Sequence, residues 1–307
     1  MQLHGFRCGL LFLFFSFASA LFGQTKSKDI LFIRHGQSTY NQMMEQKHKL
    51  QKLKKIAFSR KKIKDANLTQ NGIVEALKLR SCLLESLGSE DVNLKFIAKA
   101  LLEPRADVMV LSSNLRRAVN TGLLVLYGDD RDKEIPLKRK QPIYPIYVSS
   151  LLQEWGVPQA VPDVMPHSKN FFKHGQLISS AVQSSLGSFT GNLEKYLKIF
   201  PKDREISTEG QLRRGKGNTK RLKDKYNGFL QNIVFADSQE VNLDLSKKQV
   251  IVVFGHGRWL KGFVNFFSDS GEAKMGIAPN ASLTHMKLEK HDNGKYRLSY
   301  LESYTAL

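Results

Sequence analysis

Three short apolar runs end abruptly in polar turns, and this pattern constrains the fold more than any other feature of the chain. The runs cover residues 30–33, 107–111 and 249–254, and segments with helical spacing follow them. Short apolar runs bounded by polar turns are typical of strands buried in a sheet. Strands that alternate with helices predict an α/β fold, a three-layer sandwich with a mostly parallel central sheet and helices on both faces.

Further elements fit this architecture. Thr69 is a suitable N-cap for a helix that runs to Gly88. The remaining predicted elements are a helix over about 115–127, a short strand within 143–153, helices over 186–200 and up to Phe235, and a terminal pair of strands at 282–289 and 296–302.

Polar residues follow each of the three buried strands. The first strand is followed by Arg34-His35-Gly36, and the last by Gly255-His256-Gly257. The middle strand ends in serines, with Arg116-Arg117 one helical turn later. Ligands of such sheets bind outside the carboxyl ends of the strands. We therefore expect two histidines and two arginines to converge at one edge of the sheet.

These residue types suit phosphoryl transfer. An arginine fork binds two phosphate oxygens at once, and a neutral histidine can attack phosphorus near pH 7. Surrounding cations stabilise the charge on the transferring group, and the leaving alkoxide needs a proton donor. The sequence has no GxxxxGK[ST] loop, no metal-ligand cluster and only two cysteines, Cys8 and Cys82. It predicts neither a bound metal nor a cofactor.

The same motifs resemble those of the histidine phosphatase superfamily, in its phosphoglycerate mutase-like branch. The resemblance covers most of the chain from Asp29 to about Leu288 and depends on six landmarks in order. Gln37-Ser38-Thr39 after the Arg-His-Gly motif is similar to the mutase-like branch, because the acid phosphatase branch carries R-H-G-x-R-x-P. The landmarks are Arg34 to Thr39 with Asn41, Asp65 to Gly72, Ser112 to Ala118, Leu152 to Gly156, Phe254 to Gly257, and Pro279 to Ser282.

The resemblance implies a role for each motif residue. His35 would be the phosphoryl acceptor and Glu154 the proton donor, with Arg34, Arg117 and His256 binding the phosphate. Within the Arg-Arg pair, the pattern S-x-L-x-R-A assigns the phosphate contact to Arg117. Ser38 and Asn41 either touch the substrate or cap the following helix.

The expected activity is metal-independent hydrolysis of phosphomonoesters through a phosphohistidine intermediate. One alternative is a phosphotransferase of the phosphoglycerate mutase type. The other is an inactive phosphate-binding module that basic segments recruit to anionic membranes.

The N-terminus has the pattern of a secretory signal. Arg7 precedes an apolar run of about a dozen residues, and Ala18-Ser19-Ala20 gives an A-x-A cleavage site. Residues 1–20 are therefore predicted to be a signal peptide, with an uncleaved anchor as the alternative, and 29–307 a single domain. The signal predicts the secretory pathway or the extracellular space as the location.

The net charge of +19 predicts attraction to anions, and two basic insertions near 47–64 and 201–225 carry much of it. Suitable partners are a phosphorylated small molecule, a phosphorylated protein or lipid, and an anionic membrane surface. Nucleic acid is disfavoured because no aromatic residues interleave the basic runs.

Overall fold

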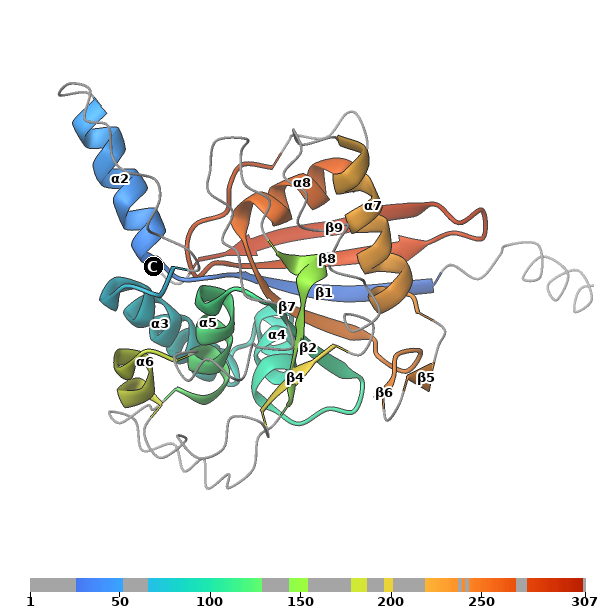
Figure 1. Cartoon of the computed structure of the whole chain (residues 1–307). Coiled ribbons are helices and arrows are strands. Elements are labelled where there is room, and N and C mark those ends of the chain that lie inside the picture. The colour runs from blue at the N-terminus through green and yellow to red at the C-terminus, as the bar shows by residue number, and fades with distance from the viewer. Residues whose placement is uncertain are drawn as a thin grey trace, which may run out of the picture.

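A seven-stranded sheet forms the centre of the protein (Figure 1). The structure is a computed structural model that describes residues 26–51, 66–128, 144–153, 178–186, 196–200, 219–236, 239–240, 243–268 and 275–305. The strand order is β4-β3-β2-β7-β1-β8-β9. The strands are β1 Lys26–Arg34, β2 Val108–Ser113, β3 Ile146–Ser149, β4 Leu197–Ile199, β7 Val250–Gly255, β8 Leu283–Lys290 and β9 Tyr296–Tyr304, and a separate hairpin consists of β5 Gln239–Glu240 and β6 Leu243–Asp244.

The sheet is mostly parallel, as predicted. The five strands from β4 to β1 run parallel to one another. β8 pairs antiparallel with β1, and β9 pairs antiparallel with β8. Because the three predicted buried strands β1, β7 and β2 are neighbours in this sheet, their carboxyl ends lie side by side.

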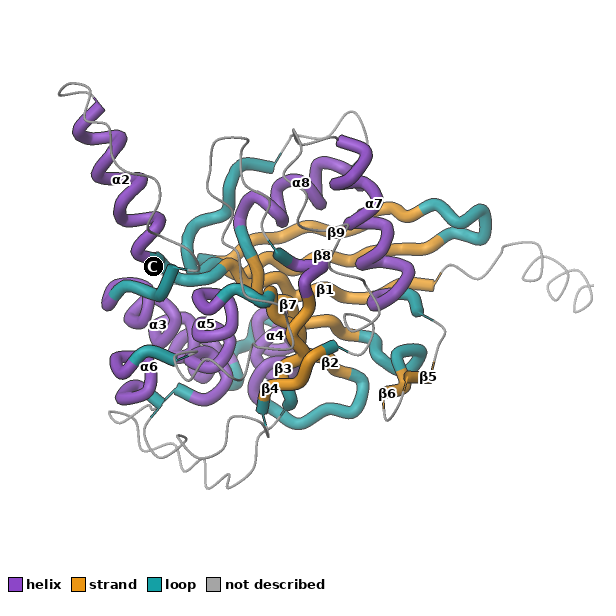
Figure 2. Tube along the Cα trace, viewed as in Figure 1, coloured by secondary structure: helices purple, strands orange, loops and turns teal. Residues whose placement is uncertain are grey.

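Helices cover both faces of the sheet (Figure 2). Alternate side chains of β1 face opposite layers. Leu31 and Ile33 pack with one set of helices, α3, α4, α5 and α6, while Ile30 and Phe32 pack with α7 and α8. The helices are α2 Thr39–Gln51, α3 Gln70–Ser86, α4 Val92–Leu102, α5 Arg116–Tyr127, α6 Ser180–Ser185, α7 Thr219–Phe229 and α8 Gly257–Phe267, with a 3₁₀ turn at Ser150–Leu152 and a π-helical turn at Leu230–Val234. This arrangement confirms the predicted three-layer α/β sandwich.

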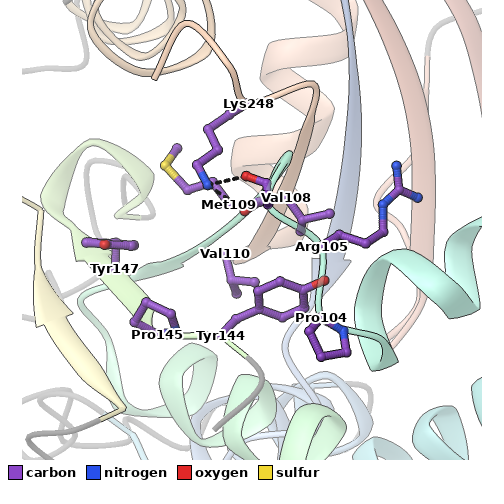
Figure 3. A pocket seen from close by; sticks show the side chains of 10 residues that line it. Pro104, Arg105, Val108, Met109, Val110, Tyr144, Pro145, Tyr147 and Lys248 are labelled. Carbon is purple, nitrogen blue, oxygen red and sulfur yellow. Dashed lines mark hydrogen bonds between the residues drawn. The ribbon is translucent and has the colours of Figure 1, made fainter. Parts of the chain in front are cut away.

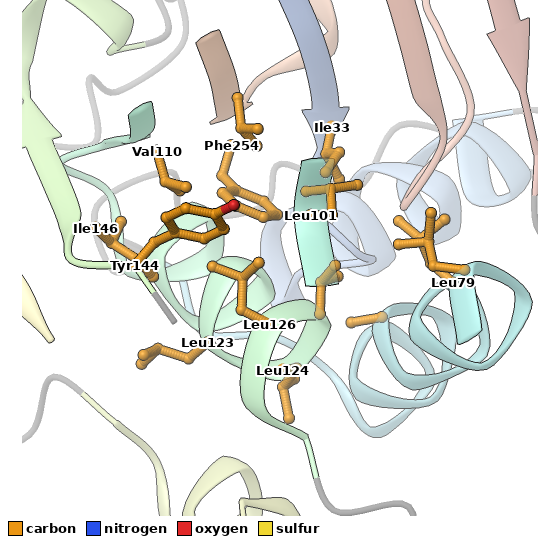
Figure 4. Close-up of a cluster of buried hydrophobic side chains, with 14 of the residues drawn as sticks. Ile33, Leu79, Leu101, Val110, Leu123, Leu124, Leu126, Tyr144, Ile146 and Phe254 are labelled. Atoms are coloured by element: carbon orange, nitrogen blue, oxygen red, sulfur yellow. The ribbon is translucent and has the colours of Figure 1, made fainter. Parts of the chain in front are cut away.

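Two hydrophobic clusters fill the spaces between the layers. Figure 4 shows the first, in which Ile33, Val110 and Phe254 of the sheet meet Leu101 of α4 and Leu123 of α5. In the second, the Trp259 ring stacks on those of Phe32 and Phe263, with centroids 5.6 and 4.9 Å apart. Burial of both sheet faces explains why the central strands read as continuous apolar runs in the sequence.

Most predicted elements are present. The differences concern β4 and α4, and α6 and the hairpin of β5 and β6 also have no predicted counterpart. Thr69 caps α3 by accepting a hydrogen bond from the Gly72 N–H at 3.1 Å, as expected. The helix predicted over 186–200 is wrong where the structure describes it, because 197–199 forms the edge strand β4 beside β3. In addition, α4 was not predicted, although Asp91 caps it through two backbone N–H groups.

Several predicted segments lie outside the described residues. These are the signal segment 1–20, residues 52–64 and 201–218 of the basic insertions, and Glu154. The first basic insertion begins within α2, which projects away from the body of the protein (Figure 1). Within the described parts of the chain, no helix is long and apolar enough to cross a membrane.

Candidate active site at the carboxyl ends of the central strands

The residues predicted to converge do so. His35 follows β1 and His256 follows β7, and register pairing places Arg34 beside Gly255. The His35 N–H donates to the Gly255 carbonyl at 3.0 Å. The two imidazole rings lie edge to face with centroids 5.1 Å apart. Adjacent parallel strands thus bring together two histidines that are 221 residues apart in the sequence (256 − 35).

The His35 ring has one defined orientation. Its Nδ1 atom lies 2.7 Å from the Gly36 carbonyl oxygen, which can only accept, so Nδ1 carries the proton. Its Nε2 atom accepts a hydrogen bond from Nε of Arg117 at 3.1 Å. The tautomer follows from these partners. The basic lone pair of His35 therefore points at the guanidinium group of Arg117.

The two predicted phosphate-binding arginines come from different elements. Arg117 lies in the first turn of α5, directly after β2, and is only 1% exposed. Arg34 is half-buried at the end of β1, and its Nη1 donates to the Ala278 carbonyl. A Cβ atom on Gly257 would come within 3.0 Å of the Arg34 side chain. Glycine at that position therefore leaves room for the guanidinium group beside the second histidine.

Ser113 orients His256. The Leu115 N–H donates to the Ser113 hydroxyl oxygen at 3.4 Å, and this oxygen lies 2.8 Å from Nε2 of His256. The hydroxyl can donate to Nε2 or accept from it, according to the tautomer of the ring. The serine turn after β2 fixes the ring of the second histidine.

Burial and positive neighbours keep both histidines neutral. Burial lowers the pKa of His35 well below its usual value, and the charges of Arg117 and Arg34 lower it further. Burial likewise lowers the pKa of His256, helped by Arg117, His35, Lys225 and Arg34. Near pH 7 the His35 ring is thus a neutral base whose Nε2 lone pair faces Arg117.

Solved structures that resemble this chain include phosphoglycerate mutase from Bacillus anthracis, phosphoserine phosphatase from Entamoeba histolytica and mycobacterial glucosyl-3-phosphoglycerate phosphatase. Their identities to the chain are 14%, 14% and 13%, and the TM-scores are 0.45, 0.40 and 0.40. The matches cover 90%, 91% and 89% of this chain and 92%, 98% and 98% of the others.

No protein-family model and no curated protein matches the sequence.

Ser38 and Asn41 bond to each other at the start of α2. The Ser38 N–H and hydroxyl donate to Oδ1 of Asn41 at 3.2 and 2.6 Å, and the Asn41 N–H donates back to the Ser38 hydroxyl at 3.3 Å. This reciprocal pattern is a helix N-cap. Of the two roles open to these residues in the sequence, the contacts seen here are those of the cap.

The landmark around Thr69 supports the loop that follows His35. The Thr69 hydroxyl contacts the side-chain oxygen of Gln37 at 2.9 Å, and the Gln37 N–H donates to the Glu75 carboxylate at 2.6 Å. The backbones touch so closely that a Cβ on Gly72 would lie 2.0 Å from the Gln37 carbonyl oxygen. Glycine is therefore required at position 72, since only it permits this approach.

The loop that leads to Glu154 is held by residues of α7 and α8. The Trp259 Nε1–H donates to the Leu151 carbonyl, and Nζ of Lys225 donates to the Gln153 carbonyl, both at 3.0 Å. Glu154 itself lies outside the described residues. The structure thus fixes the residue before the predicted proton donor through a lysine of α7.

Lys225 and Thr121 are site residues that the sequence did not single out. Lys225 belongs to the basic insertion near 201–225 in the sequence, and its charge helps to lower the pKa of His256. Thr121 lies one helical turn after Arg117 and contacts the loop of His35. The Arg117–Thr121 spacing of four residues could have indicated that both side chains share one face of α5.

A separate cavity of about 320 Å³ lies at the opposite end of the parallel strands from the histidines (Figure 3). It is open at the amino ends of β2, β3 and β7, where Nζ of Lys248 donates to the Ala106 carbonyl at 2.6 Å. Its walls include Pro104, Arg105, Met109, Tyr144, Tyr147 and Lys248. The histidines lie at the carboxyl ends of the parallel strands and the cavity lies at their amino ends, so the two are separate sites.

Proposed function

We propose that this protein is a histidine phosphatase that hydrolyses phosphomonoesters without a metal ion. One observation carries the proposal: the Nε2 lone pair of His35 faces the guanidinium of Arg117, while the Gly36 carbonyl holds the other ring nitrogen. A neutral imidazole held in this way is an oriented nucleophile beside a phosphate-binding cation.

In the proposed reaction, a phosphate ester displaces the contact between Arg117 and His35 and binds between them. Nε2 of His35 attacks phosphorus, so that an N–P bond forms and the P–O bond to the leaving alcohol breaks. Glu154 would supply the proton that the leaving oxygen takes up. Water then attacks the phosphohistidine, returns a proton to Glu154, and releases inorganic phosphate. Arg34, Arg117 and His256 stabilise the phosphoryl oxygens throughout.

The physiological substrate class is a phosphorylated small molecule, protein or lipid, and a secretory or extracellular location follows from the signal pattern in residues 1–20. The basic segments near 47–64 and 201–225 would attract an anionic surface. These parts of the proposal depend on the sequence alone.

The test is hydrolysis of p-nitrophenyl phosphate in the presence of a chelator. Wild-type protein should be active, and His35→Ala should lose at least about a thousandfold in kcat, because the nucleophile is missing. His285→Ala, which removes a histidine bonded to Asp29 away from the site, is the matched control. Full activity of His35→Ala would refute the proposal. Turnover of 3-phosphoglycerate to an isomer would instead indicate a mutase, and binding of phosphate esters without turnover would indicate a binding module.

A further inference from the structure

A closed ring of four hydrogen bonds links His35 to Arg117. His35 Nδ1–H donates to the Gly36 carbonyl at 2.7 Å, and the Gly36 N–H donates to the Thr121 hydroxyl at 3.1 Å. That hydroxyl donates to the Arg117 carbonyl at 2.7 Å, and Nε–H of Arg117 donates back to Nε2 of His35 at 3.1 Å. We call these four residues the His35–Arg117 ring.

Thr121 is the member that joins the two halves of this ring. A hydroxyl has one hydrogen to donate and can accept at the same time. Here the hydrogen is used on α5, at the Arg117 carbonyl, and the oxygen accepts from the loop after β1. The side chain is fully buried, so no water competes for either bond. Thr121 therefore sets the distance between the loop of His35 and the helix of Arg117.

The Gly36 contact fixes more than the loop backbone. The peptide N–H of Gly36 donates to the Thr121 hydroxyl, and the carbonyl of the same residue accepts from the His35 ring. If the Gly36 N–H lost its buried acceptor, it would have to seek another partner. The carbonyl would then move with it, and the His35 ring would lose the contact that holds its proton on Nδ1.

We propose that Thr121 is a positioning residue, which aligns the attacking nitrogen of His35 with the phosphate-binding guanidinium of Arg117. This inference rests on the proposed function. In-line attack requires the reacting atoms to approach within about 3–3.5 Å in the right direction, and small misplacements lower rates strongly. Thr121 touches neither substrate nor reacting atoms, so its effect passes through the orientation of His35.

The experiment compares Thr121→Val, which keeps the shape but removes the hydroxyl, with Thr121→Ser, which keeps the hydroxyl. On p-nitrophenyl phosphate, Thr121→Val should lower kcat about 10- to 100-fold with KM within about threefold, since the binding cations remain. Thr121→Ser should stay within about threefold of wild type in kcat. Thr284→Val is the matched control, because it removes a buried hydroxyl that bonds to Ser303 at 3.1 Å, away from the ring.

A second measurement reports the tautomer of the His35 imidazole and does not depend on catalysis. The ¹⁵N NMR signals of His35, assigned by their loss in His35→Asn, should show a single Nδ1–H tautomer in wild type and a tautomer mixture in Thr121→Val. Should the valine variant fail to fold, Thr121→Cys, whose thiol is a weak hydrogen-bonding group, carries the same two expectations.

The outcomes separate this inference from the proposed function. A wild-type protein without activity would refute the proposed function, while the tautomer comparison would still decide the role of Thr121. The inference is overturned if Thr121→Val retains both kcat and the single tautomer. It is also overturned if Thr121→Ser or Thr284→Val loses as much activity as Thr121→Val, since the effect would then be one of general packing.

Discussion

Nε of Arg117 donates a hydrogen bond to Nε2 of His35 across 3.1 Å, in a region where both side chains are almost completely buried. The proposed nucleophile and the proposed phosphate-binding group are therefore direct neighbours before any substrate arrives. A phosphoryl group that binds to Arg117 must come to lie against the lone pair of His35.

Arg117→Ala should lower kcat/KM for phosphate-ester hydrolysis by about 10²- to 10³-fold, because it removes a preorganised donor to the transferring group. Arg117→Lys should recover part of that loss, since it keeps the charge but not the two-pronged geometry. Arg116→Ala, at the partly buried neighbouring position, should remain within about threefold of wild type. Steady-state kinetics of the three variants would test this, and an equal loss in Arg116→Ala would speak against the assignment.

Gly72→Ala should destabilise the protein by about 3 kcal/mol or more and abolish activity, because the new Cβ would lie 2.0 Å from the Gln37 carbonyl oxygen. The loop after His35 cannot move away without disturbing the orientation of the His35 imidazole. Gly88→Ala, beyond the other end of α3, meets only an ordinary contact at 3.8 Å and is the control. Urea unfolding and activity would be measured together, and wild-type behaviour of Gly72→Ala would rule out the close approach.

Lys225→Met should slow the hydrolysis of alkyl phosphates by about tenfold and that of p-nitrophenyl phosphate much less. The reason is that Lys225 holds the Gln153 carbonyl, directly before the proposed proton donor, and only poor leaving groups need that proton. Lys261→Met removes the same charge from an exposed position on α8 and controls for the overall charge. Equal losses on both substrates would argue against a role for Lys225 in placing the acid.

Stability should fall on acidification in a way that depends on the two buried histidines. Their pKa values in the folded state lie below the ordinary value of about 6.5. Below that pH the unfolded chain binds more protons than the folded protein, so stability rises with pH in this window. The stabilising contribution of the two neutral histidines is fully present above about pH 6.5 and is lost as the pH falls toward their folded pKa values. The free energy of unfolding then changes by up to about 2.7 kcal/mol per pH unit for two groups.

Urea unfolding at several pH values between about 5.5 and 7.5 would measure this slope. The double variant His35→Asn/His256→Asn should flatten the curve, because asparagine does not titrate. An unchanged slope in the double variant would show that other groups cause the acid sensitivity.

The sequence predicts the site because its residues lie at strand ends. An apolar run that stops at a polar turn locates the carboxyl end of a strand in a parallel sheet, so topology alone could bring together Arg34, His35, His256 and the pair Arg116-Arg117. The choice of Arg117 within that pair came from the family motif. The same reasoning could not find Thr121 or Lys225. Thr121 contacts a loop that precedes it by 85 residues, and Lys225 contacts a carbonyl 72 residues away. Strand ends indicate neither contact, and the only local signal is the four-residue spacing between Arg117 and Thr121.

The prediction of secondary structure is wrong at β4, where the local sequence signal is only three residues long. Residues 197–199 form a three-residue strand because β3 offers it an edge, and so few residues cannot distinguish a strand period from a helical one. By contrast, α4 had a usable signal in the Asp91 cap followed by apolar residues at helical spacing. Pairing with a neighbouring strand thus determines β4, whereas α4 follows from a local sequence signal.

The central claim is that His35 accepts the phosphoryl group on Nε2. It is tested most directly by mixing the protein with a phosphate ester, quenching with alkali during turnover, and mapping the phosphorylated residue by mass spectrometry. The account predicts an acid-labile phosphoryl group on Nε2 of His35 that is absent from His35→Ala and still forms in His285→Ala. A phosphoryl group on His256, or turnover without any phosphohistidine, would contradict it.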